Sequence, residues 1–331
     1  MSILNQEIII TKNEEKLHLI DLHRHLDGSV RLSTVLDLAR QYGIELPASD
    51  IESLRPYVEV SGSEAGLMAF IARFEYLTAV MVNAEACRRI AYENVLDAAE
   101  EGIDYIELRF SPVFMAETHQ LDPADVVDAV IDGVSEGVAK TNVNAQLIGI
   151  LSRSYGQESC MEELSKLLRR KDDLVAIDLA GNEKEFPASL FVDHFKLVRE
   201  AGLSVTVHAG EADGPHSVWS AINNLGATRI GHGFRSIEDE GLVEHLAEKR
   251  IGLEVCLTSN LHIGAIESYE LHPAKALFDA GVLMNLNTDD PGISGIDLPH
   301  EYSVAADTAG FVHEDKAKLM ENAAKMAFKA I

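Results

Sequence analysis

The stretch Asp21-Leu22-His23-Arg24-His25-Leu26-Asp27-Gly28 lies at the end of the first short apolar run of the chain. It contains a cluster of polar side chains. Similar short runs recur along the sequence, each bounded by Gly, Asp, Asn or Pro, as is typical of buried parallel strands. The pattern predicts eight strands, at Leu19–His25, Ile103–Ser111, Ala145–Leu151, Val175–Ala180, Ser204–Ala209, Arg229–Gly233, Leu253–Thr258 and Leu283–Thr288.

Segments with apolar spacing near 3.6 residues lie between these runs and predict helices. They are Glu85–Glu101, Pro123–Lys140, Ser189–Ala201, Val218–Leu225 and Glu238–Lys249. Glycines that suit helix C-caps precede several strands, at Gly102, Gly202, Gly226, Gly252 and Gly281. Eight strands alternating with helices favour an α/β fold of the (β/α)₈, or TIM barrel, type over an open sheet. With no linker or repeat in the sequence, we expect one domain over 1–331.

The segment between the first two strands is unusually long, and it predicts extra helices inserted after strand one, at Ser33–Tyr42 and Ser63–Val82. The second carries an apolar stripe at helical spacing, formed by Leu67, Phe70, Ile71, Phe74 and Leu77. The stripe has two interpretations. One is ordinary core packing, and the other is the apolar wall of a lid over a pocket.

Composition excludes several classes of function. The 331 residues hold 28 Lys and Arg against 54 Asp and Glu, a net charge of −26 that disfavours binding to nucleic acid or to an anionic membrane. No apolar run approaches the ~18 residues that span a bilayer, and the N-terminus lacks the features of a signal peptide. Three scattered cysteines, Cys87, Cys160 and Cys256, predict no disulfide framework. We expect a soluble cytoplasmic protein.

Metal-ligating side chains gather at the predicted strand ends, which is where barrel enzymes place their chemistry. His23 and His25 alternate with Arg24 and so point to one face of strand one. Alone this pair is weak evidence, since a His-x-His arises readily by chance among 13 histidines. His208 and Asp289 end two other strands, and together the four side chains make an N₃O set suited to zinc, with room for a water.

Three further groups suggest proton transfer beside this set. Glu211 lies three residues beyond His208 and suits a general acid or base, although it could instead cap the following helix. His232 lies between two glycines and is open to substrate or water, although a lone histidine can also be structural. Asp290 follows Asp289 where the strand turns, so one carboxylate could bind metal while the other holds water or substrate.

Five motifs together resemble adenosine deaminase of the metal-dependent amidohydrolase type, in its bacterial branch. They are residues 21–28 quoted above, Glu107-Leu108-Arg109-Phe110-Ser111-Pro112, Val207-His208-Ala209-Gly210-Glu211, Arg229-Ile230-Gly231-His232-Gly233 and Asn287-Thr288-Asp289-Asp290-Pro291. The resemblance runs in order over nearly the whole chain. It implies one Zn²⁺ per chain, bound by His23, His25, His208 and Asp289.

The resemblance also implies the remaining roles. Glu211 would donate a proton to purine N1, while His232 and Asp290 would orient and deprotonate the attacking water. Substrate contacts would come from His25, Asp27, the Gly181 backbone and Asp290. The implied reaction is hydrolysis of adenosine, and of 2′-deoxyadenosine, to the inosine product and ammonia, as in purine salvage. The implied partner is a small-molecule purine nucleoside.

Two alternatives stay open at this point. A sister deaminase acting on adenine or on an N6-substituted purine nucleotide would share the metal set, although Asp27 favours a nucleoside and Arg24 alone is a poor phosphate site. A non-catalytic zinc-binding protein is the other alternative. Glu211, His232 and Asp290 weigh against it, because a structural zinc site is closed and needs no adjacent proton-transfer groups. The oligomeric state does not follow from the sequence.

Overall fold

The computed structural model describes residues 17–64 and 66–331. Within them, eight parallel strands pair in sequence order around a barrel, which confirms the predicted TIM barrel. Each strand is short and mostly buried, as parallel strands covered by helices are. The strands are β1 (Ile20–His25), β2 (Tyr105–Phe110), β3 (Asn144–Ser152), β4 (Ala176–Ala180), β5 (Ser204–Ala209), β6 (Arg229–His232), β7 (Gly252–Val255) and β8 (Met284–Leu286).

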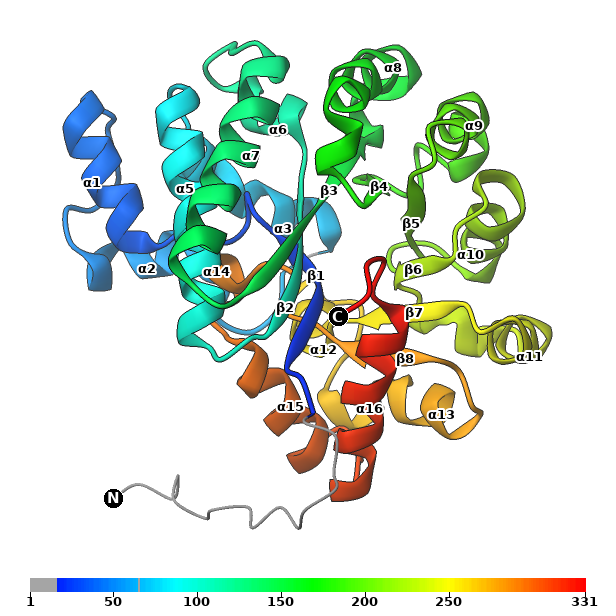
Figure 1. The fold of residues 1–331 in the computed structure, drawn as a ribbon. Helices are drawn as coiled ribbons and strands as arrows, with labels where there is room; N and C mark the ends of the chain where they lie inside the picture. The colour runs from blue at the N-terminus through cyan, green and yellow to red at the C-terminus, as the bar shows by residue number, and fades with distance from the viewer. Residues whose placement is uncertain (1–16, 65) are drawn as a thin grey trace.

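Helices surround the strands on the outside (Figure 1). Long amphipathic helices such as α5 and α7 pack side by side and bury their apolar faces toward the sheet. The helices are α1 (Leu32–Tyr42), α2 (Ile51–Val58), α3 (Leu67–Ile71), α4 (Glu75–Thr78), α5 (Ala84–Glu100), α6 (Pro112–Glu117), α7 (Pro123–Lys140), α8 (Gly156–Leu167), α9 (Val192–Glu200), α10 (Pro215–Ser220), α11 (Glu240–Lys249), α12 (Leu257–His262), α13 (Ala274–Asp279), α14 (Pro291–Ser294), α15 (Leu298–Asp307) and α16 (His313–Met326). Shorter helical turns are η1 (Ala72–Phe74), η2 (Arg153–Tyr155), η3 (Leu168–Asp173), η4 (Ala188–Phe191), η5 (Ala221–Leu225), η6 (Phe234–Glu238) and η7 (Tyr269–Leu271).

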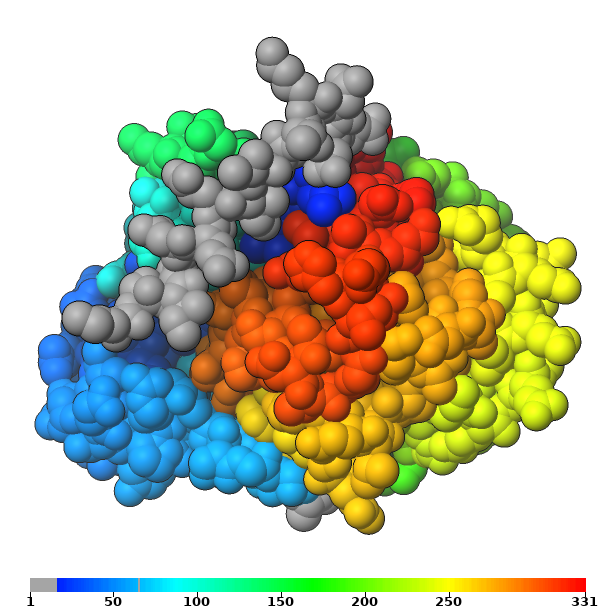
Figure 2. Space-filling model, turned by 90° about the horizontal axis from the view of Figure 1, so that it is seen from below, coloured from blue at the N-terminus to red at the C-terminus, as the bar shows by residue number. Residues whose placement is uncertain are grey.

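The barrel closes between β1 and the residues that follow β8. The amide of His25 donates to the carbonyl of Asp289 at 2.7 Å, and the amide of Asp289 donates to the carbonyl of His23 at 2.8 Å. Side chains extend this closure, since Thr288 Oγ1 donates to Asp21 Oδ2 at 2.6 Å. Helix α16 contacts both β1 and β8, and Figure 2 shows the red C-terminal segment directly beside the blue start of the described chain. This seam brings His23 and His25 of the metal-ligand set next to Asp289.

The C-terminal residues close the opposite end of the barrel, where the strands begin. The carbonyl of Met326 accepts from Arg229 Nη1 at 2.9 Å, and the amide of Phe328 donates to Glu107 Oε1 at 2.8 Å. The Phe328 ring lies 3.7 Å from the Arg229 guanidinium carbon. The chain end therefore lies at the centre of the ring of helices in Figure 1.

Some predicted boundaries were wrong for local reasons. The segment Ser63–Val82 is not one helix but α3, η1 and α4. Gly66 has a φ of 106°, so α3 begins only after it, and Thr78 Oγ1 bonds back to the Phe74 carbonyl where α4 ends. The strand predicted at Leu253–Thr258 ends at Val255, because the Glu301 carboxylate accepts the amides of Leu257 and Thr258 and so begins α12.

The predicted cap at Gly252 was also wrong. Arg250, with a φ of 55°, is the residue that ends α11, and Gly252 is the first residue of β7. The other predicted cap glycines, Gly102, Gly202, Gly226 and Gly281, all have positive φ angles. No helix in the described part of the chain is long and apolar enough to cross a membrane.

Candidate active site

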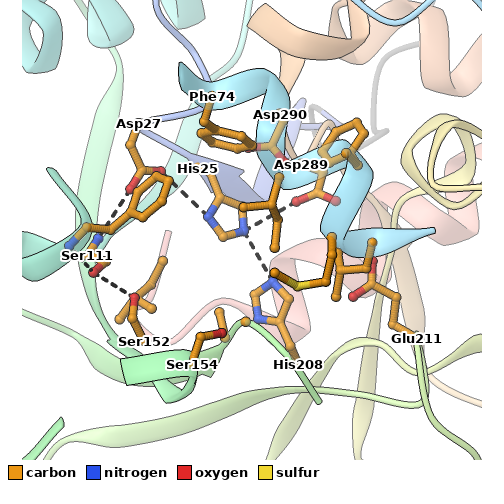
Figure 3. Close-up of a pocket in the computed structure, with 18 of the residues that line it drawn as sticks. His25, Asp27, Phe74, Ser111, Ser152, Ser154, His208, Glu211, Asp289 and Asp290 are labelled. Atoms are coloured by element: carbon orange, nitrogen blue, oxygen red, sulfur yellow. Dashed lines mark hydrogen bonds and ion pairs between the residues drawn. The ribbon is translucent and has the colours of Figure 1, made fainter. Parts of the chain in front are cut away.

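A cavity of about 260 Å³ lies at the C-terminal ends of the strands. The residues that line it include His25, His208, Glu211, His232, Asp289 and Asp290. Figure 3 shows Glu211 and Asp289 across the cavity from Asp27, Ser111 and Ser152. The structure therefore brings the residues singled out in the sequence into one place, as the barrel topology requires.

His23, His25, His208 and Asp289 present one ligand atom each, all within 4.8 Å of one another. Asp289 Oδ1 lies 3.2 Å from His23 Nε2 and 3.3 Å from His25 Nε2, and His25 Nε2 lies 3.2 Å from His208 Nε2. His23 Nε2 is buried with no hydrogen-bond partner among the described residues, as expected of an atom that ligates a metal. Burial lowers the pKa of His25 well below its ordinary value, which leaves its lone pair free. The four groups fit a metal ion.

Buried carboxylates hold two of these imidazoles from behind. His23 Nδ1 lies 2.7 Å from Glu254 Oε2, and His208 Nδ1 lies 2.9 Å from Asp178 Oδ2. Arg109 connects the two carboxylates, with Nη1 2.8 Å from Asp178 and Nη2 2.7 Å from Glu254. Such partners put the ring proton on Nδ1 and turn Nε2 toward the metal position.

His232 approaches the same point from the end of β6. Its Nε2 lies 3.5 Å from Glu211 Oε1 and 3.8 Å from Asp289 Oδ2. His232 and Asp289 have φ angles of 59° and 62°, unusual values for residues other than glycine. Backbone strain of this kind is concentrated at functional sites.

Glu211 is buried on the loop that follows β5. Burial raises its pKa well above the ordinary value, and the nearby Asp289 and Glu183 raise it further. This direction favours the protonated form of the carboxyl group, which can donate a proton. The alternative role as a helix cap is wrong, because Gly214 is the N-cap of α10 and no side chain caps that helix.

Asp290 and Asp27 are the two other acids of the cavity. Burial raises the pKa of Asp290 well above its ordinary value, with Asp289 the next contributor, and raises the pKa of Asp27 to about 7. Asp290 Oδ1 is buried with no partner among the described residues. A Cβ on residue 28 would lie 1.7 Å from that oxygen, so Gly28 is needed for the close approach.

The apolar wall of the cavity comes from the insertion after β1. Leu67, Phe70, Ile71 and Phe74 of the predicted stripe line the cavity. Phe74 also packs edge-to-face on Phe114, with ring centroids 5.6 Å apart. The stripe therefore agrees with both interpretations, core packing and the apolar wall of a pocket, since its side chains are packed and also face the cavity. Gly181, after β4, also lines the cavity.

Several residues of the site were not predicted from the sequence. Asp178 and Glu254 lie inside β4 and β7, where a lone acid in an apolar run was the only signal. Glu183 follows Gly181 and accepts four backbone amides of the loop that carries Glu211. Asn260 contacts His232 on the side away from the cavity, and His272 contacts Asn260. No sequence motif marks these residues, because each contacts a residue that is distant in the sequence and is brought near only by the fold.

Comparison with known proteins agrees with this geometry. The family model described as adenosine deaminase matches residues 19–330. A curated adenosine deaminase of Shewanella loihica is 52% identical over 315 residues, covering 95% of each chain. Two solved structures are similar across 95% of this chain. One is an adenine deaminase of Arthrobacter aurescens, with a TM-score of 0.88, 26% identity and 95% of that chain covered. The other is an N6-methyl-AMP deaminase of Arabidopsis thaliana, with a TM-score of 0.80, 27% identity and 92% of that chain covered.

Proposed function

The chain belongs to the adenosine deaminase family, and from that premise we propose that it hydrolyses adenosine and 2′-deoxyadenosine to inosine or 2′-deoxyinosine and ammonia. One observation carries the proposal. A metal-ligand set and the buried carboxyl groups of Glu211 and Asp290 face a single cavity of about 260 Å³. In that combination the metal site and Asp290 would activate water, and Glu211 would donate a proton to the purine.

Zinc is the metal we propose, one ion per chain, bound by His23, His25, His208 and Asp289. Three imidazoles and one carboxylate are a donor set that zinc favours, and catalytic zinc sites keep a position open for water. When bound, the ion would lower the pKa of that water and make it nucleophilic near neutral pH.

Glu211 supplies the proton that activates the purine. Its buried, protonated carboxyl donates to N1, which draws electrons from C6 and opens that carbon to attack. The proton remains on N1 in the inosine product, so the Glu211 carboxylate must take up another proton before the next turnover. The second proton of the added water, released as the C6 carbonyl forms, balances this step. Because the group is buried beside Asp289 and Glu183, its neutral form is favoured before each turnover.

His232 and Asp290 act on the face from which water adds. As a pair they orient the water and accept one of its protons, which passes to the departing amino group, so that the C6–N6 bond breaks and ammonia leaves. Asp290 Oδ1 has no competing partner among the described residues, and the close approach to Gly28 fixes its position. We propose that Asp290 also contacts purine N7.

The far end of the cavity suits a neutral sugar. Asp27 Oδ2 lies 3.5 Å from the Ser111 amide, and Ser111 Oγ lies 2.8 Å from Ser152 Oγ (Figure 3). We propose that Asp27 accepts a ribose hydroxyl, that the Gly181 backbone and His25 contact the purine, and that the stripe of Phe70 and Phe74 covers the ring. Among the described residues that line the cavity there is no Lys or Arg to neutralise a phosphate.

The test is a comparison of kcat/KM for adenosine, 2′-deoxyadenosine, adenine and AMP, followed by ultraviolet absorbance and ammonia release, with metal content measured on the same sample. We expect the nucleosides to be preferred. Preference for adenine or AMP would favour the sister activities instead, and zinc without turnover would indicate a binding protein. We further propose that residues 1–331 form one domain and that the enzyme acts in purine salvage. We also propose a cytoplasmic location, since Cys87, Cys160 and Cys256 are free and buried.

A further inference from the structure

A chain of three buried side chains runs from His232 away from the cavity. Asn260 Nδ2 lies 3.2 Å from His232 Nδ1, and His272 Nε2 lies 3.1 Å from Asn260 Oδ1. We propose that Asn260 and His272 are positioning residues that hold the His232 imidazole in the tautomer with its proton on Nε2. The proposal rests on the proposed function, and it defines what His232 contributes to that reaction.

The direction of every hydrogen bond in this chain follows from one backbone amide. The Ala274 amide donates to His272 Nδ1 at 3.0 Å, so His272 Nδ1 carries no proton. The neutral His272 ring therefore carries its proton on Nε2 and donates it to Asn260 Oδ1. This fixes the amide of Asn260, whose Nδ2 must then donate to His232 Nδ1. His232 Nδ1 is thus an acceptor, and the proton of the neutral ring lies on Nε2.

The surroundings keep the chain neutral and in place. Asn260 is fully buried, His232 is 1% exposed and His272 is 5% exposed. Burial lowers the pKa of His272 to about 3, and Phe234 packs on its ring with centroids 5.4 Å apart. A buried side chain that loses its partner would carry an unsatisfied polar group, so a flip of the Asn260 amide costs two hydrogen bonds at once.

The tautomer assigns different roles to His232 and Asp290 at the cavity. His232 Nε2–H faces Glu211 and Asp289 and is a donor, so His232 supplies a hydrogen bond to the oxygen that adds to C6. A ring that carries its proton on that nitrogen cannot take a proton there. Removal of the water's proton therefore belongs to Asp290, and His232 orients and stabilises the oxygen.

The experiment reads the tautomer directly. Protein labelled with ¹⁵N-histidine gives distinct nitrogen shifts for protonated and unprotonated ring nitrogens, and a His232→Gln variant assigns the signal. We expect wild-type His232 to show a protonated Nε2 and an unprotonated Nδ1. In Asn260→Leu and His272→Phe we expect a mixture of tautomers, a kcat lower by roughly ten- to a hundredfold and a KM within about twofold of wild type.

Two further variants separate positioning from stability. His272→Gln keeps an N–H donor toward Asn260 Oδ1, so it should recover most of kcat. His194→Gln is the matched control, because His194 is also a buried histidine but bonds the Gln157 carbonyl outside the site. It should lower the melting temperature without changing kcat.

The two proposals fail in distinguishable ways. The tautomer is measured without turnover, so a wild-type His232 ring protonated on Nδ1 overturns this inference even in an active enzyme. Wild-type kcat in Asn260→Leu, or no difference between His272→Phe and His272→Gln, also overturns it. Absence of adenosine turnover in the wild type instead overturns the proposed function.

Discussion

The carboxylate of Glu183 accepts the backbone amide of Glu211 at 3.3 Å, so one buried acid fixes the chain position of another. The same carboxylate accepts the amides of Gly210 at 2.7 Å, Ala212 at 2.8 Å and Asp213 at 2.9 Å. Four amide donors on one carboxylate leave little freedom to the loop after β5. The negative charge of Glu183 also raises the pKa of Glu211. One side chain therefore sets both the place and the protonation of the proposed acid.

Replacing Glu183 with Gln should lower kcat by roughly 10- to 100-fold, because an amide turns an N–H group toward backbone donors and removes the charge. Zinc content should stay near one per chain. Asp239→Asn is the control, since Asp239 caps α11 on the outside of the barrel. Steady-state kinetics at several pH values test this. An unchanged kcat would show that the loop holds Glu211 in place without the hydrogen bonds to Glu183.

Glu211→Gln should abolish most turnover while metal and nucleoside binding persist. A glutamine can hydrogen-bond to N1 but cannot deliver a proton, so we expect a loss of about 10²–10⁴-fold or more in kcat. Activity of the wild type should fall as pH rises through the raised pKa of Glu211, since only the protonated form is active. Loss of zinc in the variant would make Glu211 a ligand instead.

His208→Ala should remove metal and activity together, because His208 is one of three imidazoles of the ligand set. His216→Ala is the matched control, since its side chain is 75% exposed and outside the set. Metal analysis after dialysis, with kinetics on the same samples, decides the matter. Full zinc and turnover in His208→Ala would refute the assignment.

Phe74→Ala should raise KM for adenosine several-fold, since this ring lines the cavity. It should also cost up to about 3–5 kcal/mol of stability, the range for a buried Phe, because the ring packs on Phe114. Phe195→Ala, at a fully buried ring on α9, should lower stability alone. Thermal melts set beside KM separate the two effects. An unchanged KM would return the stripe to ordinary packing.

Glu163 should make the protein less stable as pH rises toward 8. Burial raises its pKa from 4.5 to about 7, so the folded state holds a proton that the unfolded state has released. That contribution is complete below pH ~4.5 and is lost as pH rises through about 7, with a total of about 3 kcal/mol. In Glu163→Gln the stability curve between pH 5 and 8 should be flatter, as measured by urea unfolding. An equal slope in both proteins would show that Glu163 is ionised when folded.

The fold and the site differ in how far the sequence predicts them. Strands such as Ser204–Ala209 and helices such as Pro123–Lys140 matched the structure at both ends, because apolar periodicity and terminal Pro or Gly are local signals. The start of α12 was missed, because a distant carboxylate, Glu301, causes it.

The predicted ligands and acids all lie at one cavity, because a barrel places the C-terminal ends of its strands close together irrespective of the loop sequences. Their supports were not predictable in the same way. Asp178, Glu254 and Glu183 act across the barrel, and only the register of the strands shows that Asp178 meets His208. The tautomer of His232 depends on Asn260 and His272, which lie on other elements.

The seam between β1 and the end of β8 gives the proposed metal a structural role as well as a catalytic one. His23 and His25 stand on one side of it and Asp289 on the other, with two backbone hydrogen bonds between them. An ion held by these groups cross-links the beginning and the end of the chain, and its binding free energy adds to folding. Chelated protein should therefore be cut faster than zinc-loaded protein by a protease in a timed digest, and equal rates would refute this. The zinc supply of the cell would then govern how long each molecule survives, as well as how fast it turns over substrate.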